Sequence, residues 1–407
     1  MKNTPEIRFK GFINAWVQRK LGEISTSFSG GTPSVGNSKY YGGEIPFIRS
    51  AEINSDSTEL FLSEQGLKNS SAKMVQKGDI LYALYGATSG EIGISKIRGA
   101  INQAILAIKP NEAYDTQFIA QWLRLNKPNI IEKYLQGGQG NLSAAIVKDL
   151  YIDFPDKTEQ TAIGNFFRTL DSAIALLKRT LIGFKKLKKA YLQQMFPQEG
   201  ETVPKVRFEG FRGGWEVRKL GDVVEKLKSY PLSRDAETNE VTGYRYIHYG
   251  DIHKQIADVV VSDEQLPCIK EGNYTSIEKG DLLLADASED YVGIAKPCII
   301  MHKPKDKIIA GLHTIAIRPL NTYPLFLYFL FHTDGFKKFG GFIGTGLKVF
   351  GITYDNLARY EMALPNFEEQ TVISSFFCNL DKQITSQQTK LDNLKKIKSI
   401  YLQKMFV

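Results

Sequence analysis

The sequence has little cysteine: Cys268, Cys298 and Cys378 are its three, with no CxxC pair among them. This excludes a disulfide-stabilised scaffold and a cysteine zinc site, and it favours reduced, buried thiols. The first residues lack the apolar core of a secretory signal, so we expect a cytoplasmic protein. No apolar run approaches the ~18–20 residues that a membrane-spanning helix needs, so a membrane is not expected as a partner.

The sequence also lacks the short motifs of several enzyme classes. It has no Gly-Lys dipeptide for a phosphate-binding P-loop, and no Asp-x-Lys or Glu-x-Lys of the common metal-dependent nucleases. Pro-Pro, a usual part of base-directed amino-methyltransferase motifs, is missing, as are HExxH and Gly-x-Ser-x-Gly. All five histidines lie in the second half, and we interpret His248 and His253 as surface or groove residues rather than metal ligands. These absences leave no recognised motif for catalysis or for binding a metal or a cofactor.

The composition supports a folded protein with an anionic partner. Hydrophobic residues make up 43% and aromatic residues 11% of the 407 residues, which is enough for sizeable cores. The chain has 52 lysines and arginines against 44 aspartates and glutamates, a net charge of +8. Residues 156–200 carry 8 basic and 4 acidic groups and residues 366–407 carry 6 and 4, so these two segments hold six of the eight charges. The sign favours a polyanion such as DNA, although a membrane surface would also match it.

The chain contains an internal repeat of about 200 residues. Residues 5–22 return as residues 204–221 at an offset of 199. The ends match best, because residues 170–196 align without gaps with residues 380–406 at an offset of 210. Because the ends match and the middles diverge, we predict two copies of one framework that do related jobs on two different targets.

Each copy begins with a predicted mixed α/β domain. Short apolar runs at residues 80–84 and 104–108 indicate strands, and glycine-rich turns separate such runs. One or two helices are expected to follow, near residues 116–125 in the first copy and 324–331 in the second.

A long helix is predicted to close each copy. Asp156 and Asn366 each stand three residues before a glutamate, which is typical of a helix start. Apolar residues then recur at spacings of three and four, as in a heptad seam, at Leu170, Ile174, Leu177, Leu181, Phe184, Leu187 and Tyr191, and at Leu380, Ile384, Leu391, Leu394, Ile397 and Tyr401. A helix over residues 159–196 is too long for one small domain, so we expect an antiparallel pair.

The predicted fold class is therefore α+β (mixed α/β), with two domains in pseudo-two-fold tandem repeat separated by two long helices that form an antiparallel coiled coil. The expected segments are a first α/β domain at residues 1–155, a central helical spacer at 156–203, a second α/β domain at 204–365 and a C-terminal helical spacer at 366–407.

This two-copy plan resembles the specificity subunit of type I restriction–modification systems over essentially the whole chain. Residues 30–34, 40–48 and 77–80 look like one common target-recognition domain of that family, and residues 245–252 and 279–282 look like another. The helix starts resemble the family's conserved helical regions, through Glu159-Gln160 with Phe166-Phe167 and Glu369-Gln370 with Phe376-Phe377. The second domain lacks the Gly-Thr-Pro-Ser signature of the first, so residues of the first domain are not transferred to it.

The resemblance implies a DNA-binding role without catalysis. Each recognition domain would read one half of a bipartite, asymmetric site in double-stranded DNA, and the helices would set the half-site spacing. Two methyltransferase subunits that methylate adenine N6 would dock on the chain, and two motor-nuclease subunits would complete the restriction form. S-adenosylmethionine, and ATP with Mg²⁺, would belong to those partners. A stand-alone sequence-specific DNA-binding protein, or an enzyme with an unrecognised site, are the alternatives.

Candidate base-reading residues lie on polar and glycine-rich loops, because such loops can reach into the major groove from a rigid sheet. In the first domain they are Thr32, Lys39, Tyr40, Tyr41, Arg49, Tyr85, Thr88, Ser89, Gln103, Gln139, Asn141 and Ser143. In the second domain they are Tyr244, Arg245, Tyr246, His248, Tyr249, His253, Ser288, His313, Thr345 and Lys348. Each could instead lie on a turn that touches only solvent or phosphate.

Aromatic residues at matched positions of the repeat are the candidates for partner docking. They are Phe166, Phe167, Tyr191, Phe196, Phe376, Phe377, Tyr401 and Phe406, with packing between the helices as the alternative for the phenylalanine pairs. Trp16 and Trp215 also recur and are interpreted as core anchors. The lysines at residues 185–189 form the densest charge run, which is either a solvated helix face or a contact to DNA or an acidic partner.

Overall fold

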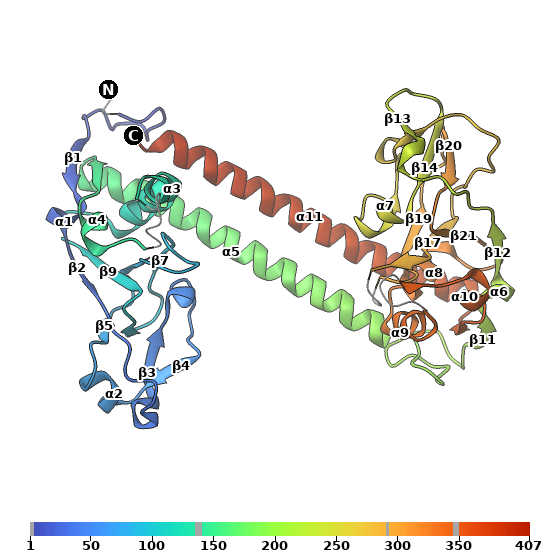
Figure 1. Ribbon diagram of the computed structural model, residues 1–407, viewed down its shortest axis with the longest axis horizontal. Helices are drawn as coiled ribbons and strands as arrows, with labels where there is room; N and C mark the ends of the chain where they lie inside the picture. Colours follow the sequence, from blue (N-terminus) through green and yellow to red (C-terminus); the bar gives the residue numbers. More distant parts are fainter. Residues whose placement is uncertain (1–3, 135–140, 290–292, 345–349) are drawn as a thin grey trace. The chain divides into compact units, whose positions relative to one another are not determined.

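The computed structural model describes residues 4–134, 141–289, 293–344 and 350–407, which form two compact units (Figure 1). Unit 1 consists of Met1–Arg179 together with Gln388–Val407, and unit 2 of Thr180–Gln387. Each unit therefore combines one α/β domain, the first part of the long helix that follows it, and the last part of the other copy's long helix. The division of the chain into four segments stays a prediction.

Unit 1 is built on two four-stranded sheets, with strand orders β2-β9-β6-β7 and β4-β3-β8-β5, and on a β1-β10 pair. Its strands are β1 (Val17–Lys20), β2 (Ser25–Ser29), β3 (Tyr41–Ile48), β4 (Leu60–Leu62), β5 (Lys73–Val75), β6 (Ile80–Ala83), β7 (Ile92–Ile94), β8 (Gly99–Ile101), β9 (Ile105–Pro110) and β10 (Tyr151–Phe154). Its helices are α1 (Leu21–Ile24), α2 (Glu64–Lys68), α3 (Thr116–Tyr134) and α4 (Ala144–Lys148), with 3-10 turns η1 (Ser38–Tyr40) and η2 (Ser50–Glu52). The strands expected at 80–84 and 104–108 are thus confirmed as β6 and β9, and α3 extends the helix expected at 116–125.

Unit 2 repeats this plan around a five-stranded sheet, β12-β21-β17-β19-β15, and a four-stranded sheet, β13-β16-β14-β20. Its strands are β11 (Glu216–Lys219), β12 (Val224–Leu227), β13 (Glu237–Thr238), β14 (Tyr244–Ile247), β15 (Val259–Val260), β16 (Cys268–Ile269), β17 (Leu282–Ala285), β18 (Ala287–Ser288), β19 (Pro297–Ile300), β20 (Lys307–Ala310), β21 (Thr314–Pro319), β22 (Phe350–Gly351) and β23 (Glu361–Leu364). Its helices are α6 (Leu220–Val223), α7 (Tyr249–His253), α8 (Pro324–Leu330), α9 (Asp334–Ile343) and α10 (Tyr354–Leu357), with 3-10 turns η3 (Arg234–Ala236) and η4 (Asp263–Gln265). The helix expected at 324–331 is confirmed as α8.

The two long helices are confirmed as α5 (Lys157–Gln194) and α11 (Phe367–Met405). Their predicted caps are also found, because Asp156 Oδ1 accepts the main-chain N–H of Glu159 and Asn366 Oδ1 accepts that of Glu369, both at 2.9 Å. Neither glutamate side chain completes a capping box. Each binds an arginine of its own unit instead, as described below.

Within each unit the two helices run antiparallel. In unit 1, Phe166 meets Tyr401 with ring centroids 5.2 Å apart, and Lys398 Nζ lies 2.6 Å from Asp171. In unit 2, the repeat-related pairs are Tyr191 with Phe376, at 5.1 Å, and Lys188 with Asp381, at 2.6 Å. The same contacts are thus made twice, with the partners exchanged between the copies.

The seam prediction is wrong for two residues. Leu187 on α5 and Ile397 on α11, which occupy equivalent positions of the repeat, are 41% and 42% exposed. A strict heptad reading places them in the seam, but a helix of 3.6 residues per turn drifts from a 3.5-residue pattern. Both side chains therefore remain on the helix surface.

The end of each long helix completes the core of an α/β domain. In unit 1, Phe406 packs against Trp16 and Phe118, at centroid distances of 6.4 and 4.9 Å. In unit 2, Phe196 packs against Trp215 and Phe326 in the same way, at 6.4 and 5.2 Å. Both tryptophans are buried, which confirms them as core anchors. The two chain ends consequently meet in unit 1 (Figure 1), where Ile7 donates its N–H to the Lys404 carbonyl at 2.9 Å.

Candidate nucleic-acid interface

A polar face forms in unit 1 where β6 ends and β9 begins. These strands are antiparallel neighbours, so the residues after β6 and before β9 lie at the same sheet edge. The Tyr85 hydroxyl donates to the Gln103 carbonyl at 2.5 Å, and the Tyr85 backbone bridges that of Asn141. Thr32 donates to Gln103 Oε1, also at 2.5 Å. We call Thr32, Tyr85, Gln103 and Asn141 the unit 1 face; it brings together predicted base-reading residues from distant parts of the sequence.

The side chains of the unit 1 face are available to a ligand. Thr32, Gln103 and Asn141 are exposed and Tyr85 is half-buried. Burial raises the pKa of Tyr85, which keeps its hydroxyl protonated as a donor. The face thus offers amide and hydroxyl groups without a formal charge.

Two neighbouring candidates, Ser89 and Ser143, bind the local backbone. Ser89 Oγ donates to the Gly86 carbonyl at 3.0 Å and, like Thr88, is half-buried in the turn after β6. Ser143 caps α4, because its Oγ accepts the N–H of Ile146 at 3.2 Å. Gln139 lies outside the described residues.

The remaining candidates of unit 1 lie around β3. Lys39 is exposed and Tyr40 half-buried in η1, and the Tyr41 hydroxyl donates to the Pro33 carbonyl at 2.7 Å. The Arg49 guanidinium binds Glu52 at 3.0 Å and Glu59 at 2.5 Å, and these bonds raise its pKa. A base contact by Arg49 would require the bond to the exposed Glu59 to open.

In unit 2 an aromatic and histidine-rich face forms at the equivalent edge. The Tyr249 ring lies 4.4 Å from the ring of His248, 5.8 Å from His253 and 5.3 Å from His313. His313 Nδ1 lies 3.0 Å from Asp286 Oδ1, and His253 Nε2 donates to the first carbonyl of β18 at 2.8 Å. We call Tyr249, His253, His313 and Asp286 the unit 2 face. The predicted base contact of His248 is corrected, because its side chain is 7% exposed and its Nδ1 accepts the N–H of Gly250 at 3.1 Å at the start of α7.

Backbone hydrogen bonds show that the two faces are equivalent. In unit 1, the Leu84 carbonyl accepts a hydrogen bond from the N–H of Leu142, and the Leu84 N–H donates to the Ala104 carbonyl, both at 2.8 Å. In unit 2, the Asp286 main-chain carbonyl accepts from the N–H of Ile352 at 2.8 Å, and the Asp286 N–H donates to the His313 carbonyl at 3.1 Å. His313 therefore corresponds to Ala104, and the polar Asp286 replaces the apolar Leu84.

The unit 2 face carries electrostatic and conformational strain. Burial raises the pKa of Asp286, although the adjacent His313 opposes this rise. Burial also lowers the pKa of His248, and the charge of Arg234 adds to that effect. His313 has a φ of 57°, a left-handed conformation that costs a non-glycine residue roughly 1–2 kcal/mol. Such strain is concentrated at functional sites.

The structure corrects several assignments in the second domain. Tyr246 is fully buried and donates its hydroxyl to Glu237 at 2.8 Å, so its side chain belongs to the core. Arg245 is held by Asp306 at 2.9 Å, and Ser288 is 5% exposed within β18. The sequence alone does not show which side of β14 faces the core, because that depends on where the second sheet packs.

Other predicted positions fall at the margin of the face or outside the description. The Tyr244 hydroxyl accepts a hydrogen bond from Lys307 at 2.9 Å, away from the unit 2 face. Thr345 and Lys348 lie outside the described residues. Asp286 is the residue that sequence reasoning missed: it lies directly after the buried strand β17, two residues before the candidate Ser288, but was not among the predicted residues.

A buried ion pair fixes each domain to its helix. Arg8 binds Glu159 through two bonds of 2.8 and 2.6 Å, and Arg207 binds Glu369 through two of 2.7 and 2.8 Å. The glutamate side chains are 0% and 1% exposed. A two-bond guanidinium–carboxylate pair is strongly directional, so it fixes orientation as well as contact.

The predicted docking aromatics divide into two groups. Phe167, Phe196, Phe377 and Phe406 are at most 5% exposed and fill the cores, which leaves them no surface for a partner. Phe166, Tyr191, Phe376 and Tyr401 are half-buried between the helices. Partner docking stays a prediction for this second group.

The described residues include no group of three or more histidines, cysteines, aspartates or glutamates placed to hold a metal ion. No described helix is long and apolar enough to cross a membrane.

Comparisons with known proteins agree with the duplicated plan. Two matches to the type I restriction modification DNA specificity domain cover residues 14–184 and 212–396. The MjaVIII specificity subunit of Methanocaldococcus jannaschii is 20% identical over 392 residues, covering 94% of this chain and 90% of that protein. The MjaIX specificity subunit of the same organism is 24% identical over 234 residues, and the match spans about half of either protein, 52% in both.

Solved structures show the same fold. The S subunit of a type I restriction–modification system from M. genitalium covers 99% of this chain and 99% of its own length, with a TM-score of 0.63 at 15% identity. A structure from a study of type I complex assembly covers 97% of this chain and 98% of its own, with a TM-score of 0.54. Because the specificity-domain matches account for most of the sequence, the chain belongs to the family of type I restriction–modification DNA specificity proteins.

Proposed function

We propose that the chain is the DNA specificity subunit of a type I restriction–modification complex, with each face reading one half of a bipartite, asymmetric site. One observation carries the proposal: the two faces occupy equivalent edges of equivalent frames, yet their side chains differ. A duplicated frame with different reading groups suits a target whose two halves differ in sequence.

The side chains of the faces suit base edges in the major groove. Glutamine and asparagine, as at Gln103 and Asn141, can pair with adenine through two hydrogen bonds. Asp286 can accept from the cytosine amino group, and Thr32 can contact either a polar edge or a thymine methyl. Tyr249 adds an aromatic surface beside the histidines.

The long helices set the half-site spacing and dock two methyltransferase subunits, which modify adenine N6. Leu187 and Ile397 support this proposal, because they are equivalent in the repeat and both are apolar and exposed. Two identical partners need equivalent surfaces. Motor-nuclease subunits complete the restriction form, and S-adenosylmethionine, ATP and Mg²⁺ are bound by these partners.

Methylome sequencing with and without this gene, in a host that expresses the methyltransferase, tests the proposal. We expect N6-methyladenine at one split motif to disappear with the gene. An unchanged methylome in the presence of an active methyltransferase contradicts the proposal.

A domain exchange tests the assignment of one half-site to each unit. Replacing residues 1–155 with another recognition domain should change one half of the methylated motif and leave the other half intact. A change in both halves would rule out two independent readers.

The introduction of negative charge tests the docking surface. The Leu187→Glu/Ile397→Glu variant should no longer co-purify with the methyltransferase. The control is Ile182→Glu, which should still co-purify with it. Ile182 is also apolar and exposed on α5, but its equivalent in the repeat is the charged Asp392. Retention by the double variant would place docking elsewhere. Specific DNA binding by the chain without any partner would favour a stand-alone DNA-binding protein.

A further inference from the structure

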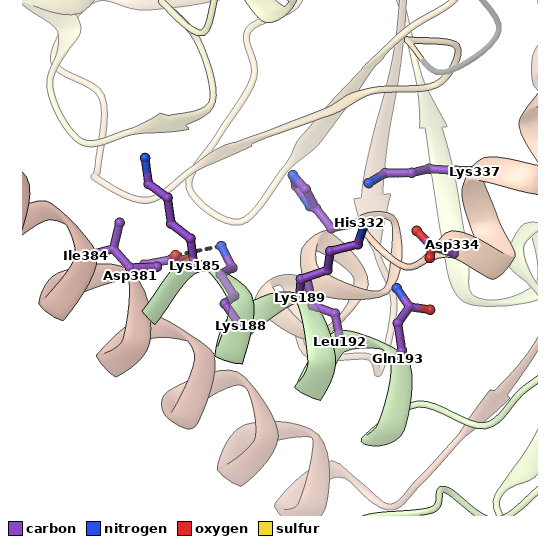
Figure 2. Close-up of a pocket in the computed structure, with 10 residues that line it drawn as sticks. All are labelled: Lys185, Lys188, Lys189, Leu192, Gln193, His332, Asp334, Lys337, Asp381 and Ile384. Atoms are coloured by element: carbon purple, nitrogen blue, oxygen red, sulfur yellow. Dashed lines mark hydrogen bonds and ion pairs between the residues drawn. The ribbon is translucent and has the colours of Figure 1, made fainter. Parts of the chain in front are cut away.

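A basic groove of unit 2 lies outside the unit 2 face. It has a volume of about 600 Å³ and is formed by three parts of the unit (Figure 2). Helix α5 contributes Lys185, Lys188 and Lys189, helix α11 contributes Asp381, and the α8–α9 junction contributes His332, Asp334 and Lys337. Figure 2 shows the Lys337 amine pointing toward His332.

The groove has an excess of positive charge. Its four lysines face two aspartates, a formal net charge of +2. Asp381 is engaged by Lys188 at 2.6 Å, and Asp334 lies in the first turn of α9, where the helix dipole favours a carboxylate. Among the described residues, Lys185, Lys189 and Lys337 have no carboxylate within 4.0 Å of their amines. Burial lowers the pKa of His332, and the charges of Lys188 and Lys337 lower it further.

The cations of the equivalent region of unit 1 are paired with carboxylates, including Arg124, which binds Asp171 at 3.3 Å. Lys185 and Lys188 correspond to Lys395 and Lys398, but these bind Asp392 at 3.3 Å and Asp171 at 2.6 Å. Lys189 corresponds to Ser399 in the repeat. Two identical protein partners need equivalent groups in both units, so an asymmetric basic groove fits a ligand that the units contact differently.

Helix α9 connects the groove with the unit 2 face. It begins beside the groove at Asp334 and ends at Ile343, and the following Gly344 packs against Ile294, in the segment after β18. Ten residues of helix span ~15 Å. B-form DNA rises 3.4 Å per base pair, so this corresponds to about four base pairs. A duplex that runs along α9 from the unit 2 face would therefore bring phosphates to the groove.

We propose that this groove binds the phosphate backbone of the DNA duplex, beyond the bases that the unit 2 face contacts, through Lys185, Lys189 and Lys337. The inference rests on the proposed function and adds a phosphate site that strengthens binding without adding sequence information. The phosphate site makes the two units bind DNA with unequal strength, because the equivalent cations of unit 1 are paired with its own carboxylates.

The test compares two triple variants in the assembled methyltransferase complex. The groove variant is Lys185→Gln/Lys189→Gln/Lys337→Gln. The control variant is Lys178→Gln/Lys186→Gln/Lys382→Gln, which removes the same charge from exposed positions outside the groove. Binding of a 30-base-pair duplex that carries the methylated motif is measured from about 50 to 300 mM KCl.

Each phosphate contact contributes ~0.9 to the slope of log affinity against log salt. We expect the groove variant to lower the magnitude of that slope by about 2 to 3, with the methylated motif unchanged, while the control and a Lys→Arg triple variant keep the wild-type slope. An unchanged slope in the groove variant, or an equal loss in the control, overturns the proposal. Loss of the methyltransferase from the complex at an unchanged slope also overturns it and identifies an acidic protein surface as the ligand. Absence of motif-specific binding by the wild-type complex would contradict the proposed function instead.

Discussion

Units 1 and 2 place the same ion pair at the start of each long helix and the same aromatic ring at its end. Arg8 with Glu159 and Arg207 with Glu369 differ by at most about 0.2 Å in bond length. At the equivalent face, however, unit 1 presents uncharged amides and hydroxyls, whereas unit 2 presents two histidines, a tyrosine and an aspartate. Residues that assemble the frame are thus separable from residues that meet the ligand, and the predictions below test that separation.

The largest effect should come from breaking the buried ion pair of either unit. Arg8→Met or Arg207→Met leaves a buried glutamate without its cation, so we expect each to lower the free energy of unfolding by roughly 3–5 kcal/mol. Urea unfolding measures the loss. The double variant Arg8→Met/Glu159→Leu should recover most of it, and a loss below about 1 kcal/mol in either single variant would show that the pair does not hold the frame.

Removing a helix-end ring should be nearly as costly and should act on one unit at a time. Phe406→Ala should destabilise unit 1 and Phe196→Ala unit 2, each by roughly 3 kcal/mol, because each ring fills a core of the domain it packs against. Hydrogen exchange locates the effect. Faster exchange in β6 and β9 after Phe196→Ala, rather than after Phe406→Ala, would contradict the exchange of helix ends between the copies.

An intermediate effect should distinguish the helix pairs. Asp171 accepts bonds from Lys398 at 2.6 Å, Gln121 at 2.8 Å and Arg124 at 3.3 Å, whereas Lys188 binds Asp381 at 2.6 Å. Asp171→Asn should therefore cost roughly 2 kcal/mol and Asp381→Asn roughly 0.5 kcal/mol. Thermal unfolding of both variants checks the difference, and equal losses would mean that the added bonds of Asp171 contribute nothing.

The smallest effect concerns acid stability. In unit 1, burial raises the pKa of Glu52, but its bonds to Arg49 and to backbone amides lower it more. In unit 2, burial raises the pKa of Asp263, but bonds from His302 and the amides of Lys305 and Asp306 lower it more. A pKa below the unfolded value adds stability above about pH 4, and this is lost as the pH falls through the folded pKa.

Glu52→Gln and Asp263→Asn should therefore weaken the pH dependence of unfolding below about pH 4, the first in unit 1 and the second in unit 2. Acid titration followed by hydrogen exchange provides the measurement. A variant whose acid unfolding matches the wild type would show that its carboxylate is not coupled to folding.

Much of the frame was predictable from local patterns. The capping residues Asp156 and Asn366 fixed the helix starts, and the 210-residue offset predicted which residues repeat each other's contacts. The faces were predictable as loops but not as side chains. Tyr246 and Tyr249 look alike in the sequence, yet one donates its hydroxyl to Glu237 inside the core and the other lies among histidines at the sheet edge.

The sequence by itself determined the duplication, the α/β-then-helix order and the absence of known catalytic motifs, because these depend on identity and spacing along the chain. Tertiary structure decided which residues share a face, since Thr32, Gln103 and Asn141 meet only when β6 and β9 pair. It also decided that Lys185 and Lys189 remain without a carboxylate while Lys395 and Lys398 find theirs. Charge partners depend on distances in space, and packing sets those distances.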